Sequence, residues 1–215
     1  MNVLVVGANG GTGQIIIQLL GRSEEHHAIA MIRDETQANH LMELGAKATV
    51  LADLEKDIEQ ALQGCDAIIF AAGSGSKTGA DKTKSVDEAG AMKLIDAAEK
   101  LGVTRFIMLS SVGADNPQMG PTDSMKVYLK SKGIADEYLK DSSLNYTIVR
   151  PGRLSYDDGI DKITLAQKLN DYSGSIARED VAKVLVESLT LQNTYKKTFE
   201  ILSGQMSITE ALQLV

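Results

Sequence analysis

Short apolar runs alternate with longer amphipathic segments along the first 150 residues of the chain. The runs are continuous rather than alternating, which is typical of strands buried on both faces of a parallel sheet. The predicted strands are Val3–Val6, Ala28–Ile32, Ala48–Leu51, Ala67–Ala72, Arg105–Leu109 and Tyr146–Val149.

The segments between these strands have apolar positions at helical spacing. Two of them end in a glycine, Gly45 or Gly102, where a helix commonly terminates. The predicted helices are Thr12–Leu20, Glu35–Leu44, Lys82–Leu101 and Ser124–Leu139. Strand and helix alternating at this spacing predict an α/β fold, a single-domain doubly wound parallel sheet.

The pattern loosens after Pro151. Residues 152–175 read as loop with one short helix at Ile163–Leu169, and the chain then predicts a helix, a strand and a final short helix. These last elements are Arg178–Thr190, Thr198–Leu202 and Ile208–Leu214. About 150 residues in the sheet leave only about 65, too few for a second domain. We therefore expect residues 1–215 to form one domain in which residues 151–215 supply a small substrate-covering part.

Composition narrows the function classes. The net charge of −7 argues against a broad basic footprint for nucleic acid. A single cysteine, Cys65, excludes an intrachain disulfide, and the three histidines lack partners at metal-ligand spacing, so no metal is expected. Neither a signal-peptide core nor an apolar run long enough for a membrane span is present, which favours a cytoplasmic protein with no membrane partner.

A glycine-rich turn joins the first predicted strand to the first predicted helix, with four glycines in the seven residues Gly7–Gly13. Glycine allows a positive φ and lets the backbone approach a pyrophosphate, while the amides at a helix start attract an anion. The context is that of a dinucleotide-binding fingerprint, although the spacing departs from G-x-G-x-x-G. A plain loop is the competing interpretation. The expected cofactor-binding residues of this turn are Gly7, Asn9, Gly10, Gly11, Thr12 and Gly13.

The end of the second predicted strand bears on the choice of cofactor. An acidic residue there usually binds the ribose hydroxyls of NAD, whereas an arginine accommodates the 2′-phosphate of NADP. Arg33 stands at this position and is followed by Asp34, which suits a helix cap. NADP is therefore favoured, with a solvent-facing Arg33 and NAD as alternatives. Asp53 and Leu54, after the third strand, are expected near the adenine, unless Asp53 is only a turn residue.

A tyrosine and a lysine lie four residues apart in the predicted helix before the sixth strand. Tyr128 and Lys132 therefore share one helix face, where the cation would lower the pKa of the phenol and make it a usable acid/base. Ser110 and Ser111 end the fifth strand, and the carboxyl ends of parallel strands meet at one crevice. We expect Ser111, or its neighbour Ser110, to orient a substrate carbonyl there.

Taken together, these motifs resemble the short-chain dehydrogenase/reductase superfamily, in particular its atypical, compact NAD(P)-binding members. The matching segments are Gly7–Gly13, Arg33, Asp53, Ala71–Gly73, Val86–Asp87, Phe106–Ser111, Tyr128 with Lys132, and Thr147–Gly152. The resemblance implies that Tyr128 is the acid/base, that Lys132 also holds the nicotinamide ribose, and that Ser111 or Ser110 positions the substrate. It further implies that Ala71, Ala72 and Gly73 line the adenosine side and that Pro151 and Gly152 pass near the carboxamide.

Two departures from the family pattern qualify this resemblance. Asp87 replaces the asparagine that many extended relatives carry, and the region after Pro151 is short. Compact relatives include flavin- and biliverdin-type reductases and regulators that only bind the dinucleotide. The expected function is NADP(H)-dependent hydride transfer to a small carbonyl or conjugated substrate. A non-catalytic NAD(P)H sensor with a protein partner and an NAD-retaining epimerase or isomerase are the alternatives; the sequence does not indicate an oligomeric state.

Overall fold

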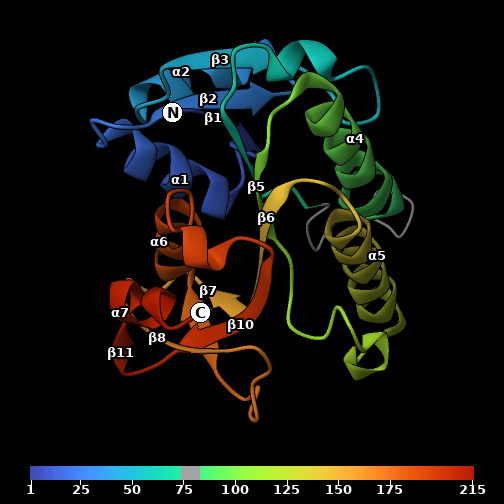
Figure 1. The fold of residues 1–215 in the computed structure, drawn as a ribbon, viewed down its shortest axis with the longest axis vertical. Helices are drawn as coiled ribbons and strands as arrows, with labels where there is room; N and C mark the ends of the chain where they lie inside the picture. The colour runs from blue at the N-terminus through green and yellow to red at the C-terminus, as the bar shows by residue number, and fades with distance from the viewer. Residues whose placement is uncertain (74–82) are drawn as a thin grey trace.

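The computed structural model describes residues 1–73 and 83–215, apart from the side chain of Lys84. Its main sheet has nine strands in the order β11-β8-β10-β6-β5-β4-β1-β2-β3 (Figure 1). Seven of them, from β3 to β10, pair in parallel, and β8 and β11 add antiparallel pairs at one edge. The run β3-β2-β1-β4-β5-β6 is the doubly wound order of a Rossmann fold, so the predicted fold class is confirmed.

The strand bounds follow the apolar runs closely in the first 150 residues. The strands of the main sheet are β1 (Asn2–Val6), β2 (His27–Ile32), β3 (Ala48–Leu51), β4 (Ala67–Phe70), β5 (Arg105–Leu109), β6 (Asn145–Pro151), β8 (Lys162–Ala166), β10 (Lys197–Ser203) and β11 (Met206–Ser207). Two further strands, β7 (Arg153–Ser155) and β9 (Ser175–Ala177), pair in parallel in a small second sheet.

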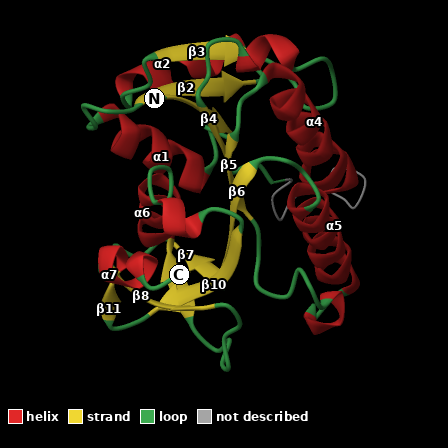
Figure 2. Ribbon diagram, in the orientation of Figure 1, coloured by secondary structure: helices red, strands yellow, loops and turns green. Residues whose placement is uncertain are grey.

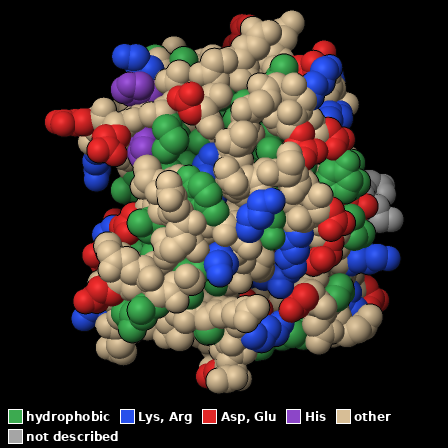
Figure 3. All heavy atoms as spheres, in the orientation of Figure 1, with side chains coloured by type: hydrophobic (Ala, Val, Ile, Leu, Met, Phe, Trp, Pro, Cys, Tyr) green, Lys and Arg blue, Asp and Glu red, His purple; other side chains and the backbone are tan. Residues whose placement is uncertain are grey.

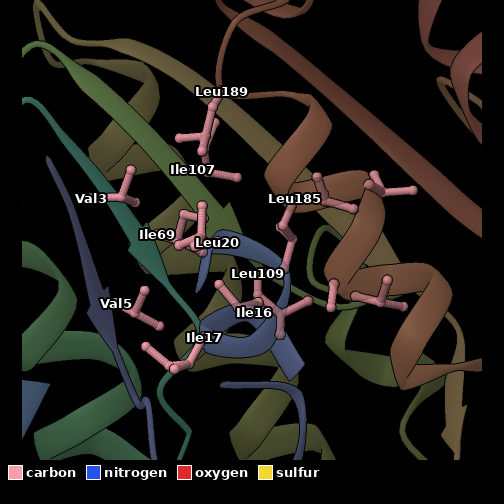
Figure 4. Packing of buried hydrophobic residues seen from close by; sticks show 14 of the residues in the cluster. Val3, Val5, Ile16, Ile17, Leu20, Ile69, Ile107, Leu109, Leu185 and Leu189 are labelled. Carbon is pink, nitrogen blue, oxygen red and sulfur yellow. The ribbon is translucent and has the colours of Figure 1, made fainter. Parts of the chain in front are cut away.

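Helices cover both faces of the main sheet (Figure 2). The α-helices are α1 (Gly11–Gly21), α2 (Ala38–Glu43), α4 (Ala91–Leu101), α5 (Asp123–Lys140), α6 (Arg178–Glu187) and α7 (Ile208–Gln213). One apolar cluster joins α1, α6 and α7 to one sheet face, and a second joins α4 and α5 to the other. In Figure 4, Ile16 and Leu20 of α1 lie between sheet residues such as Ile69 and Leu185 of α6.

The C-terminal third departs most from the sequence prediction. The helix predicted at Ile163–Leu169 is wrong, because β8 occupies Lys162–Ala166. Along β8, Ile163 is buried while its neighbours Lys162 and Thr164 are exposed, a period of two that suits a strand with one exposed face. Residues 152–175, predicted as loop apart from that helix, also contain β7 and the first residue of β9.

Smaller differences lie in the N-terminal part. β4 ends at Phe70, two residues early, so that Ala71 and Ala72 leave the sheet. A 3-10 turn, Glu35–Gln37, precedes α2, and a π-helical turn, η3 (Thr83–Gly90), precedes α4. The predicted helix start at Lys82 lies outside the described residues.

Charge is unevenly spread over the surface. On the face shown in Figure 3, Lys and Arg side chains lie across the middle, and Asp and Glu side chains lie mostly toward the edges. The net charge of −7 therefore says little about any one site. Within the part of the chain that the structure describes, no helix is long and apolar enough to cross a membrane.

Candidate functional site

The glycine-rich turn after β1 packs tightly against its neighbours. Gly7 has a φ of 84°, and a Cβ built on it would lie 2.6 Å from the Cα atom of Ala72. A Cβ on Gly13 would lie 2.1 Å from the carbonyl oxygen of Gly7. Neither position has room for a Cβ atom, so the backbone of the turn itself requires glycine at both.

Helix α1 begins without a side-chain cap. Its N-cap is Gly10, and no acidic residue occupies its first turn. The first amides of a helix have no partner within the helix, and the positive end of the helix dipole adds to their attraction for an anion. The amide side chain of Gln14 donates to the carbonyl oxygen of Asn9 at 3.1 Å, which supports the turn from the first turn of the helix.

A cavity of about 280 Å³ opens at this turn, at the carboxyl ends of β1, β2 and β4. Nine of the predicted cofactor-binding residues line it: Gly7, Asn9, Gly10, Arg33, Asp53, Leu54, Ala71, Ala72 and Gly73. Gly11, Thr12, Gly13, Pro151 and Gly152 are not among its lining residues.

Two acidic residues, one beside the cavity and one lining it, have local structural contacts. Asp34 accepts a hydrogen bond from the amide of Thr36 at 2.9 Å, which lowers the pKa of its carboxyl group, so it is the cap that its position suggested. Its neighbour Arg33 is exposed and lines the cavity. Asp53 lines the cavity as well, but its Oδ1 accepts from the amide of Glu55 at 3.0 Å. Asp53 thus shapes the turn whether or not it contacts a ligand.

Lys132 lies in α5 behind the cavity wall, only 2% exposed. Its ammonium group forms an ion pair with Oδ1 of Asp87 at 3.0 Å, and it donates to the carbonyl oxygens of Ala72 at 3.3 Å and Leu109 at 3.2 Å. Three oxygens thus match its three N–H groups. Lys132 therefore joins the end of β5 to the cavity wall at Ala72 and to the η3 turn.

Tyr128 lies one turn before Lys132, with the ammonium 5.9 Å from the centre of its ring. Its pKa is raised rather than lowered, because burial is the largest effect and the carboxylates of Asp87 and Asp136 act in the same direction. The charge of Lys132 and a hydrogen bond with Ser111 lower the pKa but do not outweigh these effects. The prediction that Lys132 brings the phenol toward neutral pH is therefore wrong, because burial and the two carboxylates together outweigh the charge of Lys132.

The two predicted serines have different surroundings. Ser110 is 3% exposed, and its hydroxyl donates to Oδ2 of Asp136 at 2.7 Å. The same oxygen accepts from Nε of Arg150 at 2.9 Å, so Ser110 belongs to a buried network. Ser111 is only partly buried, and its hydroxyl donates to the carbonyl oxygen of Val112 at 3.1 Å. Ser111 is thus the more accessible hydroxyl beside Tyr128.

Helix α5 is brought to this edge by a close approach at Gly133. A Cβ on Gly133 would lie 2.2 Å from the carbonyl oxygen of Ala114, in the loop after β5. The amide of Val112 donates to the carbonyl oxygen of Pro151 at 3.0 Å, which ties this loop to the end of β6. The predicted Pro151 thus lies next to the serines rather than on the cavity.

Sequence reasoning missed two members of this site, Asp136 and Arg150. Asp136 is fully buried, and burial raises the pKa of its carboxyl group despite Arg150 beside it. Its spacing four residues after Lys132 on one helix was a usable signal. Arg150 belongs to a strand, and nothing in its local sequence indicates its partner.

A larger cavity of about 870 Å³ lies away from these residues, between β8, β10 and the C-terminal residues. None of the predicted site residues lines it. Among the described residues, no group of three or more potential ligands is arranged for a metal ion.

The fold and this site together define a nucleotide-binding α/β protein. Residues 7–192 match the model of a family described as NAD(P)H-binding, and the chain belongs to that family. The cavity fits such a cofactor, because it combines the uncapped start of α1 with an exposed arginine and a turn that only glycine can form. A nicotinamide cofactor is therefore the group that these residues would hold.

Three relatives illustrate the family. A Bacillus subtilis protein named uncharacterized sugar epimerase YhfK is 43% identical over 216 residues, covering 99% of each chain. A Bacillus halodurans structure with the provisional name NAD-dependent epimerase/dehydratase covers all of both chains at 46% identity and a TM-score of 0.97. The oxidoreductase ylbE from Lactococcus lactis is 30% identical, with a TM-score of 0.85, covering 100% of this chain and 96% of the other.

Proposed function

We propose that the protein is an NADP(H)-dependent oxidoreductase that transfers a hydride to a small carbonyl or conjugated substrate. The observation that carries this proposal is the position of Lys132, which contacts both the cavity wall at Ala72 and the strand end beside Ser111. A nicotinamide cofactor supplies the hydride when it is bound. The protein's own residues orient the acceptor and donate one proton to it.

In this mechanism Tyr128 donates the proton and Ser111 orients the acceptor oxygen. The raised pKa of Tyr128 keeps its phenol protonated at neutral pH, which suits a proton donor in the reductive direction better than a base in the oxidative one. Lys132 maintains the geometry between the cavity and Tyr128. The name oxidoreductase given to the Lactococcus relative supports this class of reaction.

Tyr128→Phe tests the catalytic part of the proposal. We expect NADPH binding to be retained while turnover on a panel of carbonyl, quinone and flavin acceptors falls by at least about 100-fold, the range for a lost general acid. Calorimetry and NADPH oxidation measure the two effects. Full activity of the variant would remove Tyr128 from the mechanism. If the wild-type protein binds NADPH but oxidises it with no acceptor, while its capture of protein partners follows the NADPH/NADP ratio, the sensor function is favoured.

The choice of NADP rests on Arg33, which lines the cavity with its guanidinium exposed. A guanidinium pairs with a phosphate through two parallel hydrogen bonds. Calorimetry should show tighter binding of NADPH than of NADH, and Arg33→Asp should remove that preference. Equal affinities in the wild-type protein would contradict the assignment.

An NAD-retaining epimerase is the second candidate, favoured by the names of the two Bacillus relatives. It predicts that the purified protein carries NAD and that sugar epimerisation proceeds without added cofactor. Absorbance and mass spectrometry of the denatured protein would detect the retained cofactor. A preparation free of nucleotide that binds NADPH reversibly would exclude this candidate.

A further inference from the structure

Helix α6 places an arginine at the glycine-rich turn from the far end of the chain. Figure 1 shows α6 beside α1, and residues of both helices share one apolar cluster. Arg178 is the first residue of α6. A Cβ built on Gly11, the first residue of α1, would lie 3.3 Å from both Cδ and Nε of Arg178. The arginine therefore lies against the start of the helix that faces the cofactor cavity.

Arg178 is held in this position by two contacts. Its Nη1 donates to the carbonyl oxygen of Ser155 at 3.0 Å, and its Cζ lies 3.9 Å from the centre of the Tyr156 ring. Tyr156 is 83% exposed, yet its hydroxyl also lies 3.3 Å from the Cβ position of Gly11. An exposed aromatic ring and a guanidinium thus stack over the first residue of α1.

Positive charge gathers at the start of α1. The guanidinium lies beside the positive end of the α1 dipole, and the first turn of α1 has no acidic residue to offset it. Within residues 1–73 and 83–215, no carboxylate forms an ion pair with Arg178. Only one of its five N–H donors has a hydrogen-bond partner among those residues. A phosphate group would satisfy both the free donors and the helix amides.

We propose that Arg178, backed by Tyr156, binds the pyrophosphate of the dinucleotide and closes the glycine-rich turn from the C-terminal side. This inference rests on the proposed cofactor binding and adds a residue to it. Arg178 and Arg33 then have separate tasks. Arg33 contacts the 2′-phosphate that only NADP carries, whereas Arg178 contacts a group that NADPH and NADH share.

The separation of tasks gives the test. We expect Arg178→Met to weaken the binding of NADPH and NADH by the same factor, about 10-fold or more for a lost charged hydrogen bond. The NADPH-to-NADH affinity ratio would then stay at its wild-type value, whereas Arg33→Asp would lower that ratio. Calorimetry on the full-length variants measures both affinities. Arg22→Met is the matched control, because Arg22 lies exposed at the other end of α1.

The outcomes separate this proposal from the proposed function. A wild-type protein that binds neither dinucleotide contradicts the proposed function, and the role of Arg178 fails with it. A wild-type protein that binds both, with an Arg178→Met variant of unchanged affinity, overturns the role of Arg178 alone. If Arg178→Met lowers the melting temperature, Arg178→Gln is used instead, because it keeps a donor for Ser155. An equal loss of affinity for NADPH and NADH in this variant supports the proposal, and unchanged affinities overturn it.

Discussion

Strand β5 has a buried cation at each end, and the two cations have different surroundings. At its first residue, the guanidinium of Arg105 stacks on Tyr195, 4.2 Å from the ring centre. All its hydrogen-bond acceptors are uncharged oxygens, from Leu189, Asn145, Thr147, Ser188 and Thr194. Burial lowers the pKa of Arg105 to about 10, so it remains charged at neutral pH. The role of Arg105 at this end of the strand is therefore structural.

At the other end, the carbonyl oxygen of Leu109 accepts from Lys132. Here the cation has a buried carboxylate, Asp87, and a tyrosine, Tyr128, among its neighbours. Asp87 raises the pKa of both Tyr128 and Lys132, Lys132 lowers the pKa of Tyr128, and Tyr128 raises the pKa of Lys132. The two buried cations therefore differ in their surroundings. Arg105 is held by neutral dipoles and keeps a constant charge. The protonation of Lys132 depends on that of Asp87 and Tyr128, so this group of residues can respond to a ligand.

Replacing Lys132 tests this difference most severely. Lys132→Met breaks the buried ion pair between Lys132 and Asp87, so we expect the free energy of unfolding to fall by about 3–5 kcal/mol. Turnover should fall as well, because the cavity wall loses its link to β5 and Tyr128 loses the charge that lowers its pKa. Urea unfolding and NADPH oxidation measure the two effects.

Lys130→Met is the control for that variant, since Lys130 is exposed on the same helix. It should change neither quantity. A Lys132→Met protein with wild-type turnover would show that this end of β5 is as purely structural as the other.

Replacing Arg105 should affect stability alone. Arg105→Met leaves several buried oxygens without a donor, and we expect a loss of about 3 kcal/mol in unfolding free energy. NADPH affinity should be unchanged, because Arg105 lies at the opposite end of the strand from the cavity. Urea unfolding and calorimetry, with the exposed Arg153→Met as control, would check both statements. A selective loss of NADPH affinity would break the comparison.

The smallest predicted effect is that of replacing Asp87, which tests whether the pKa of Tyr128 depends on this carboxylate. The carboxylate of Asp87 raises the pKa of both Tyr128 and Lys132, so Asp87→Asn should lower both. If protonated Tyr128 is the active form, kcat/KM falls at high pH as the phenol ionises. In Asp87→Asn this fall should occur at a pH about one unit lower than in the wild-type protein. A shift of that size is equivalent to about 1.4 kcal/mol.

Asp96→Asn provides the matched control. It removes a carboxylate that accepts from the hydroxyl of another tyrosine, Tyr138, at 2.6 Å on the surface. The pH profile of kcat/KM should not move in this variant. An unshifted profile in Asp87→Asn would show that the phenol of Tyr128 does not control the rate.

The parts of the fold that the sequence predicts well are those set by neighbours along the chain. β3 and β5 begin and end as predicted. β5 is buried along its whole length and is continuously apolar after Arg105, whereas β3 lies at the edge of the sheet and is only partly buried. The turn at Gly7 is equally local, since its glycines are required by the backbone itself. β8 was missed because a strand with one exposed face needs only one buried side chain in two, and a short apolar pattern of that kind also suits a helix.

The parts that the sequence does not predict depend on contacts between distant elements. The pKa of Tyr128 is set by burial and by Asp87, a residue of a different element 41 positions away in the chain. Arg178 lies at Gly11 only because α6 packs on α1. No local spacing encodes either contact.

The packing of α6 on α1 also has a consequence for synthesis of the chain on the ribosome. Ile16 of α1 belongs to the same buried cluster as Val181 and Leu185 of α6, so the chain must be translated through α6 before that face of α1 is covered. Contacts between residues so far apart in sequence form late in folding. The helix that follows the glycine turn is therefore fully packed only after α6 has been made, although the turn itself is translated much earlier.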